Sequence, residues 1–412
     1  MRRALVTGVG AITPIGNTAH EFWENLVMGV SGVTRITRFD PEGLPVQIAA
    51  EVKDFEPGRY MDTKAARRMS RFAQLAVAAA DLAARDAGLE IGEGERERAA
   101  AAIATGAGGV LDTIEETTKF VERGPDRVGP FFVPTMAPNM GACQVAMHLG
   151  LRGPALASVA ACASGLYSYI EAKALIEAGL ADVVLAGGTE AALHPLPIAA
   201  LANMKALSRR NDEPARASRP FDRERDGFVF GEGAAVMVIE AEERARRRGA
   251  RVYGELMGGG LSCDAYHITA PREDGSGAAQ AMTAALKAAG MGADELDYIA
   301  AHGTGTPLND VSETRGIKLA LGEAARGIAV SSPKSMVGHL MGAAGAIGAL
   351  AAVMAVHHDI VPPTINLEEP DADCDLDYVP NVARERTVRA AMANGFGFGG
   401  QNGAVIFRKY AS

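Results

Sequence analysis

The sequence predicts an α/β protein in which strands and helices alternate along the chain. Apolar, strand-like runs recur at residues 4–7, 101–104, 183–186, 235–239, 298–301, 329–331 and 404–407. Helical periods at 67–87, 166–178 and 277–289 stand between them, and a glycine follows each, which is the usual signal at a helix C-terminus. Gly makes up 48 of the 412 residues, which favours closely packed layers. This alternation indicates sheets covered by helices.

The composition excludes several classes of protein. Hydrophobic residues make up 48% of the chain and charged residues 22%, so the chain can bury a large core. The net charge of −9 disfavours a broad surface for nucleic acid. The four cysteines are dispersed and lack metal-ligand spacing. We therefore expect no disulfide scaffold, no metal site and a location in the reducing cytoplasm.

Membrane and targeting signals are weak. The longest apolar stretch, residues 340–356, is mostly Gly and Ala and is shorter than the ~20 strongly apolar residues that cross a bilayer. We expect a buried helix there and no membrane insertion. The apolar run at 4–7 is too short for a signal peptide.

The best internal boundary is a charged segment at 241–251. It divides the chain into an N-terminal half, 1–250, and a C-terminal half, 251–412, each long enough to form a sheet with helices. Residues 395–400 match the pattern GxGxxG, but only 12 residues follow, too few for a nucleotide-binding βαβ unit.

A basic cluster opens the predicted helix at 67–87. Lys64, Arg67, Arg68 and Arg71 lie where the helix dipole favours acidic side chains. Two interpretations remain open: ordinary exposed side chains, or a docking patch for an acidic partner.

Three residues in unusual contexts could form an acyl-transfer site. Cys162 precedes the helical period at 166–178, where the positive end of the helix dipole favours a thiolate. His302 follows a strand-like run, and His339 precedes the small-residue helix. Each alone could be a buried structural residue, whereas together they suit a thiolate nucleophile with two imidazoles. Their spacing matches no zinc motif.

Several motifs, in order along the chain, resemble one family. Cys162 lies in AACASG, His302 in HGTGTP, Lys334 and His339 in PKSMVGH, and Phe398 in the closing GFGFGG. The segments VTGVGAITPIGN, SRPFDRERDGFVFGEG and PPTINLEEPD extend the similarity to nearly the whole chain. The sequence resembles the elongating β-ketoacyl-acyl-carrier-protein synthases, type II, of fatty-acid synthesis.

The resemblance implies a thiolase fold, with two similar βαβαβ-type halves in five α-β-α-β-α layers, and a homodimer. The N-terminal half would carry the nucleophile, and the C-terminal half the two histidines and a gating loop. It implies that Cys162 accepts the acyl group and that His302 and His339 support decarboxylation, with Lys334 as electrostatic support. The backbone N–H groups of Cys162 and Phe398 would form the oxyanion hole, and no cofactor would be needed.

The resemblance also implies contacts with an acyl carrier protein and its cargo. The residues it assigns are Lys64, Arg67, Arg68 and Lys205 for carrier docking, Thr304 and Thr306 for the pantetheine arm, and Ala107, Phe132 and Leu201 for the acyl pocket.

The sequence departs from the family pattern in three places. Ala300, Gly348 and Gly395 replace residues that, beside Asn394, hold a cation in some members, so we expect that cation site to be lost. Ala107 stands where a bulky Ile often closes the acyl pocket, which predicts tolerance of long acyl primers. AACASG and HGTGTP drift toward type II polyketide ketosynthases, which remain the alternative. A non-catalytic chain-length partner is disfavoured because Cys162 is present.

Overall fold

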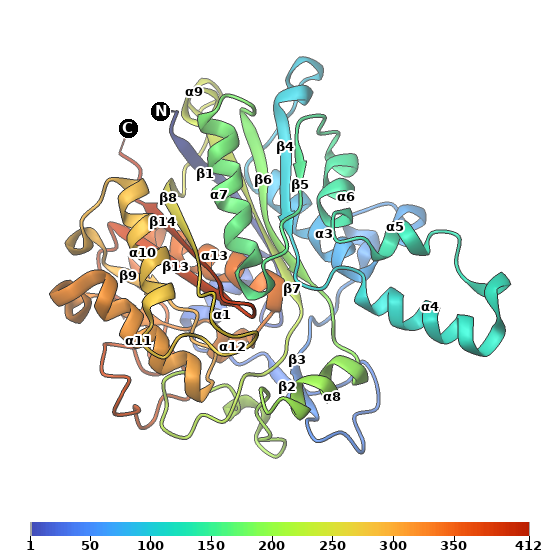
Figure 1. Cartoon of the computed structure of the whole chain (residues 1–412). Helices are drawn as coiled ribbons and strands as arrows, with labels where there is room; N and C mark the ends of the chain where they lie inside the picture. Colours follow the sequence, from blue (N-terminus) through green and yellow to red (C-terminus); the bar gives the residue numbers. More distant parts are fainter. Residues whose placement is uncertain (1, 412) are drawn as a thin grey trace.

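A ten-stranded sheet runs through the centre of the computed structural model, which describes residues 2–411 (Figure 1). The strand order is β10-β9-β13-β14-β8-β1-β7-β6-β4-β5. The N-terminal strands are β1 (Ala4–Ile12), β4 (Ala99–Ala104), β5 (Ala155–Leu156), β6 (Val183–Glu190) and β7 (Gly233–Ala241). The C-terminal strands are β8 (Gly254–Cys263), β9 (Tyr298–Ala300), β10 (Ala329–Ser331), β13 (Ala390–Gly397) and β14 (Gln401–Arg408).

The two halves of the sheet have the same topology. From the middle outward, the strands read β1-β7-β6-β4-β5 on one side and β8-β14-β13-β9-β10 on the other. In each half the first three strands pair antiparallel and the outer strands pair parallel. β1 and β8 join the halves through a short antiparallel contact between Ala4–Val6 and Gly254–Leu256.

Helices form three layers around these two half-sheets. Helices α3 (Arg71–Asp86) and α6 (Met140–Leu149) cover the N-terminal half, and α10 (Ser276–Ala289) and α11 (Pro307–Leu321) cover the C-terminal half. Helices α7 (Ser164–Glu177) and α13 (Ala344–His358) pack on each other and on strands of both halves. This arrangement confirms the predicted five-layer thiolase fold (Figure 1).

Helix α13 is the apolar stretch in the sequence. Its window Met341–His358 is long and apolar enough to cross a membrane, but 83% of that window is buried inside the protein. Every residue from Ala344 to Val356 is buried, so the prediction of a buried helix is confirmed.

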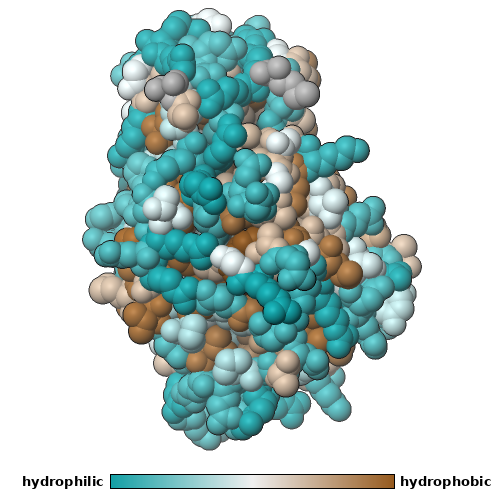
Figure 2. Space-filling view, turned by 90° about the vertical axis from the view of Figure 1, so that its left-hand side faces the viewer, coloured by the Kyte–Doolittle hydropathy of each residue, from teal (hydrophilic) through white to brown (hydrophobic). Residues whose placement is uncertain are grey.

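The face over the C-terminal half is largely hydrophilic, with hydrophobic residues in small groups, as expected for a surface in water (Figure 2).

The predicted helix at 67–87 begins too early. Helix α2 (Thr63–Ala66) ends at Arg67, and α3 begins only at Arg71, after Ser70. Asp62 caps α2 by accepting the Ala65 N–H. The argument that basic residues lie at an unfavourable helix start is therefore wrong for Arg67 and Arg68, which follow the C-terminal end of α2, where the dipole favours cations, but it holds for Arg71, the first residue of α3.

The remaining elements are short or peripheral. Helices α4 (Val110–Arg123) and α5 (Phe132–Met136) form an arm that extends from the body (Figure 1). The other helices and strands are α1 (Ala19–Val27), α8 (Pro195–Asn203), α9 (Glu242–Arg247), α12 (Lys334–Val337), β2 (Val33–Arg35), β3 (Ile48–Ala50), β11 (Ile360–Val361) and β12 (Arg384–Glu385). Short 3₁₀ segments precede α7 and α13, at Ala161–Ala163 and Met341–Ala343.

Candidate active site

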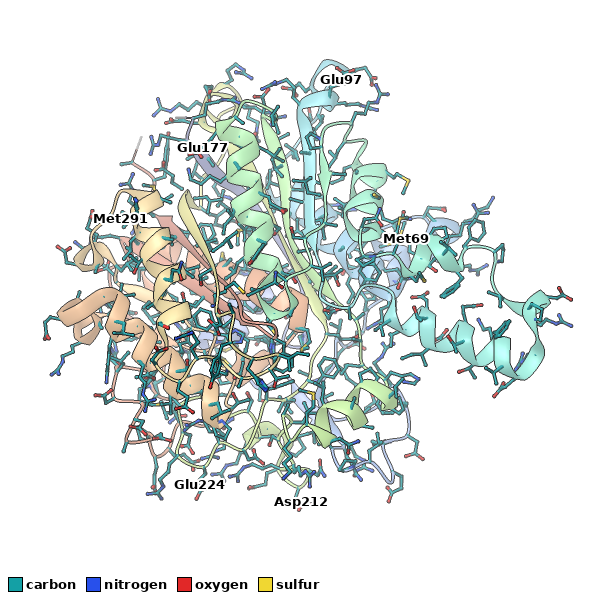
Figure 3. All side chains as sticks on the ribbon, in the orientation of Figure 1. Met69, Glu97, Glu177, Asp212, Glu224 and Met291 are labelled. Carbon is teal, nitrogen blue, oxygen red and sulfur yellow. The ribbon has the colours of Figure 1, made fainter. Side chains whose placement is uncertain are left out.

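Cys162 lies in the 3₁₀ turn in front of α7. Glu177, labelled in Figure 3, is the last residue of this helix, so Cys162 lies next to its opposite end. The preceding residue, Ala161, has a φ of +47°, an unusual conformation for a residue with a side chain. This turn places the thiol, 97% buried, beside the loop of Phe398.

Burial governs the ionisation of Cys162. It raises the pKa of the thiol to about 11, against the opposing influence of the Lys334 charge and of backbone N–H groups from Phe398 and Cys162 itself. The expectation that the helix N-terminus favours a thiolate is therefore corrected: in the free protein at neutral pH the sulfur holds its proton. The same contacts place both N–H groups of the predicted oxyanion hole against the sulfur.

His302 and His339 face each other from different segments. His302 follows β9, and His339 lies between α12 and the turn before α13. Their ring centroids are 5.5 Å apart. Both rings are buried, and burial together with the nearby charge of Lys334 holds the pKa of each well below its usual range. Both imidazoles are therefore neutral at pH 7.

The backbone fixes the tautomer of His339. Nδ1 of His339 accepts the N–H of Met341 at 3.2 Å, so the proton of the neutral ring lies on Nε2. Nδ1 of His302 is buried without a hydrogen-bond partner in the described structure. Aromatic rings enclose the pair, with Phe228 5.0 Å from His339 and Phe396 5.5 Å from His302 between ring centroids.

Glu313 on α11 supports the histidine loop, a role that motif spacing did not predict. Its carboxylate accepts the backbone N–H groups of His302 at 2.8 Å and Gly303 at 2.7 Å. Burial raises the pKa of Glu313 to about 7 and lowers that of Lys334 to about 8, and each charge favours the other. The available signal was acidic spacing: Asp310 and Glu313 lie three residues apart on a helix that starts just after the histidine loop.

One cavity of about 350 Å³ brings most of the predicted site together. Its walls include the predicted residues Cys162, His302, His339, Phe398, Thr304, Thr306 and Lys205. The hydroxyl groups of Thr304 and Thr306 are 2.9 Å apart. Lys205 is exposed, so it lies at the solvent side of this cavity.

The predicted acyl-pocket residues lie outside the walls of this cavity. Ala107 is exposed in the turn after β4, and Phe132 is half-buried in the arm. Leu201 on α8 packs against the same hydrophobic cluster as Phe228 and Met341, which do line the cavity. Their assignment to the acyl pocket stays a prediction.

The basic cluster separates into free and paired residues. Lys64, Arg67 and Arg68 are exposed, and the Arg68 guanidinium lies 5.0 Å from the Phe131 ring centroid. Met69, the next residue, is labelled beside α5 in Figure 3. Arg71 instead donates two hydrogen bonds, of 2.8 and 2.7 Å, to the buried carboxylate of Glu232. Arg71 is therefore a structural residue and not part of the exposed patch.

Some family members hold a cation at four positions that correspond here to Ala300, Gly348, Asn394 and Gly395. Only Asn394 has a side-chain oxygen. Asn394 donates to Oε1 of Glu313 at 3.3 Å, while its own Oδ1 is buried without a partner in the described structure. Ala300, Gly348 and Gly395 offer no side-chain ligand. Within residues 2–411, no group of three or more His, Cys, Asp or Glu residues could hold a metal ion. Loss of the cation site stays a prediction.

Comparison with known families identifies the chain. Residues 1–245 match the family model of the β-ketoacyl synthase N-terminal domain, and residues 253–368 that of the C-terminal domain. The chain belongs to the β-ketoacyl synthase family. Similar curated proteins include the 3-oxoacyl-[acyl-carrier-protein] synthase 2 of Synechocystis sp., 49% identical over 99% of this chain and 98% of that protein, and that of Vibrio harveyi, 48% identical over 100% and 99%.

Solved structures place this β-ketoacyl synthase in the same group. A β-ketoacyl synthase from Burkholderia phymatum STM815 superposes with a TM-score of 0.93 at 35% identity, with both chains fully covered. The ishigamide ketosynthase/chain length factor superposes with a TM-score of 0.93 at 38% identity, also over the full length of both chains. A type II polyketide ketosynthase in complex with its acyl-carrier protein superposes with a TM-score of 0.91 at 34% identity, again with full coverage.

Proposed function

We propose that this β-ketoacyl synthase is a 3-oxoacyl-[acyl-carrier-protein] synthase of fatty-acid elongation. It condenses an acyl group held on Cys162 with malonyl-carrier protein, giving 3-oxoacyl-carrier protein, CO₂ and free carrier protein. The observation that carries the proposal is the meeting of Cys162 with two neutral imidazoles in one cavity. The names of the full-length relatives support it.

The first step is acyl transfer to sulfur. Cys162 Sγ attacks the thioester carbonyl, the bond to the carrier sulfur breaks, and the thiol proton of Cys162 passes to the departing carrier thiolate, giving the free carrier thiol. Exchange of one thioester for another is nearly balanced in energy, so the protein has only to stabilise the tetrahedral oxyanion. The N–H groups of Cys162 and Phe398, which already contact the sulfur, supply that stabilisation.

The second step is decarboxylation of malonyl-carrier protein. The bond to the carboxylate breaks, CO₂ leaves, and the electron pair forms an enolate whose charge develops on the thioester oxygen. The Nε2–H of His339 and an N–H of His302 donate to this oxygen. Because both rings are neutral, they donate hydrogen bonds without readily protonating the carbanion.

The third step forms the carbon–carbon bond. The carbanion attacks the acyl carbonyl on Cys162. The backbone N–H groups of Cys162 and Phe398 donate to the second oxyanion, as they do to the first. The C–S bond then breaks, 3-oxoacyl-carrier protein is released, and the Cys162 thiolate takes one proton from solvent to restore the thiol, as its raised pKa favours. No cofactor takes part in this sequence.

The assignments of residues to partners follow the family resemblance. The acidic carrier protein would dock on Lys64, Arg67, Arg68 and Lys205, and its pantetheine arm would contact Thr304 and Thr306.

The short outer strand β5 and the exposed arm residues Phe120, Val121 and Val133 suit burial against a second copy, so we propose a homodimer. We also propose a cytoplasmic location, in keeping with the free cysteines.

A type II polyketide ketosynthase is the second candidate. The motifs AACASG and HGTGTP and the similarity to the ishigamide ketosynthase/chain length factor favour it. The two candidates share the chemistry at Cys162 and differ in the acyl chain that they extend. Cys162 argues against a non-catalytic chain-length partner.

A two-stage assay tests the proposal. Radiolabelled acyl-carrier protein should label the wild type but not Cys162→Ser, and added malonyl-carrier protein should convert the label to 3-oxoacyl-carrier protein. A primer series then separates the candidates, because saturated primers of increasing length suit fatty-acid elongation and poly-β-keto primers suit a polyketide pathway. Label retained by Cys162→Ser at a residue other than 162 would show that the nucleophile is a different residue.

A further inference from the structure

Glu190 is a fully buried carboxylate held by neutral groups. It is the last residue of β6, and its side chain contacts the turn after β4 and the turn before α13. Oε2 accepts the N–H of Gly106 at 2.9 Å and of Gly342 at 3.0 Å, while Oε1 accepts the Thr105 hydroxyl at 3.2 Å. The Ala107 N–H reaches both oxygens, at 3.3 and 3.2 Å. Among the described residues, no cationic side chain pairs with Glu190.

Every one of these partners acts as a donor. A carboxylate accepts hydrogen bonds with both oxygens. A protonated carboxyl would instead point its own O–H at one of these donor groups, which is unfavourable. Burial raises the pKa of Glu190 to about 7, and the N–H groups of Gly342, Gly106 and Ala107 oppose that rise. The backbone donors take the place of a cation in stabilising the charge.

Gly342 is the counterpart of Cys162 in the C-terminal half. Each is the second residue of a 3₁₀ turn in front of a central helix, and each follows a residue of positive φ, Ala161 at +47° and Met341 at +43°. The N–H of Cys162 contacts the reactive sulfur, whereas the N–H of Gly342 is occupied by the Glu190 carboxylate.

The turns that Glu190 joins are packed backbone against backbone. A Cβ on Gly342 would lie 2.1 Å from the nitrogen of Gly106, so there is no room for a side chain between the two turns. The turn at Met341–Gly342 also holds His339, because the Met341 N–H donates to its Nδ1. The turn at Gly106–Ala107 carries the predicted wall of the acyl pocket.

We propose that Glu190 is a positioning residue that fastens the Gly106–Ala107 turn to the Met341–Gly342 turn and so fixes the orientation of His339. The consequence for catalysis rests on the proposed function. The contacts themselves do not, because they are made between Glu190 and the backbone.

A change in the pKa of Cys162 distinguishes this role from a merely structural one. The charge of Glu190 raises the pKa of Cys162, whereas Lys334 on α12 lowers it, and the neutral rings of His302 and His339 add no charge. Replacing the carboxylate by an amide should therefore lower the pKa of Cys162. A thiol of lower pKa is alkylated faster at a fixed pH below that pKa.

The experiment compares Glu190→Gln and Glu190→Ala with Glu240→Gln. Glu240 on β7 is also fully buried. The strand register places it opposite Val183, at the end of β6 that lies farthest from Glu190. All variants carry Cys143→Ser and Cys263→Ser, so that iodoacetamide reports on Cys162 while Cys374 is buried and its pKa is raised to about 12. Rates of alkylation across pH 6–10 and kcat and KM for condensation are measured on the full-length protein.

We expect Glu190→Gln to be alkylated several-fold faster than the parent at pH 8, with Glu240→Gln unchanged. Glu190→Ala should lose about 10²-fold in kcat with little change in KM, and Glu190→Gln, which keeps one acceptor oxygen, should recover much of this loss. An unchanged alkylation rate in Glu190→Gln, or parental kcat in folded Glu190→Ala, would overturn the proposal. If Glu190→Ala does not fold, the alkylation of Glu190→Gln decides. If the parent itself fails to condense, the proposed function fails, and alkylation still tests the placement of Glu190.

Discussion

The imidazole rings of His302 and His339 meet edge to face, with 86° between their planes and 5.5 Å between their centroids. Crossed rings at this distance can direct an N–H from each toward a single point in the cavity. The Met341 N–H occupies Nδ1 of His339, so Nε2 is the atom of that ring that donates. This asymmetry between the two nitrogens can be tested by substitution.

The first prediction concerns the donating nitrogen of His339. A glutamine amide can reach the position of Nε2, whereas an asparagine amide reaches only that of Nδ1. His339→Asn should lose about 10²–10³-fold in the rate of malonyl decarboxylation, the usual cost of one oxyanion donor, and His339→Gln should lose much less. Release of labelled CO₂ measures this, and acylation of Cys162 should persist in both variants as the control. Equal losses in the two variants would contradict the assigned tautomer.

The second prediction concerns the charge on Lys334. Its ammonium lowers the pKa of Cys162, so Lys334→Met should raise that pKa and slow alkylation by iodoacetamide several-fold at pH 7. In the wild type, alkylation should quicken as the pH rises toward 11, and the acceleration should weaken near pH 8, where Lys334 itself loses its proton. Lys287→Met, at an exposed position on α10, serves as the control. Faster alkylation in Lys334→Met would show that burial and not charge dominates the role of this lysine.

Local pattern and motif order were sufficient for the fold and for the centre of the site. Strand-like runs and helix-ending glycines predicted alternating strands and helices, the family resemblance implied the five layers, and Cys162, His302 and His339 were found from their motifs. The sequence did not predict Glu190 or Glu313, because an acidic residue is ordinary until the fold buries it among backbone N–H groups.

Tertiary contacts also explain the wrong predictions. The helix expected from residue 67 starts at Arg71, where the guanidinium turns inward to Glu232 across 161 positions of sequence. The expected thiolate of Cys162 rested on the helix dipole alone, and the dipole is outweighed by burial, which only the packed structure reveals.

The third prediction concerns carrier-protein docking. Lys64→Glu with Arg68→Glu should raise the KM for malonyl-carrier protein at least about tenfold, with little change in kcat, because both side chains are exposed and far from the reacting atoms in sequence. The effect should shrink as salt is added. Lys287→Glu with Arg326→Glu is the matched control of equal charge change at other exposed positions. A small malonyl thioester that lacks the carrier protein should react equally well with all the variants.

The fourth prediction concerns primer length. The Ala107 side chain is exposed and only its backbone N–H is engaged by Glu190, so Ala107→Ile should leave the fold intact. If this position closes the acyl pocket, the wild type accepts long primers and Ala107→Ile cuts off the series at shorter chains. Condensation rates across saturated primers measure this, with hexanoyl-carrier protein as a short primer that both forms should use. An unchanged cut-off would place the end of the pocket elsewhere.

The last prediction separates two glycines on α13 by the space around them. A Cβ on Gly348 would meet only the Ala393 Cβ, at 4.0 Å, so Gly348→Ala should stabilise the protein by about 0.5–1 kcal/mol through helix propensity. A Cβ on Gly345 would lie 2.9 Å from Cγ and 3.0 Å from the backbone nitrogen of Leu166, so Gly345→Ala should destabilise by about 1–3 kcal/mol. Urea unfolding measures both. Leu166 lies in the first turn of the neighbouring α7, shortly after Cys162. A shift of Leu166 in Gly345→Ala should therefore also slow acylation of Cys162, whereas Gly348→Ala should leave it unchanged. Destabilisation by Gly348→Ala would mean that the space beside it is filled in solution, by water or by the cation that the sequence suggests it has lost.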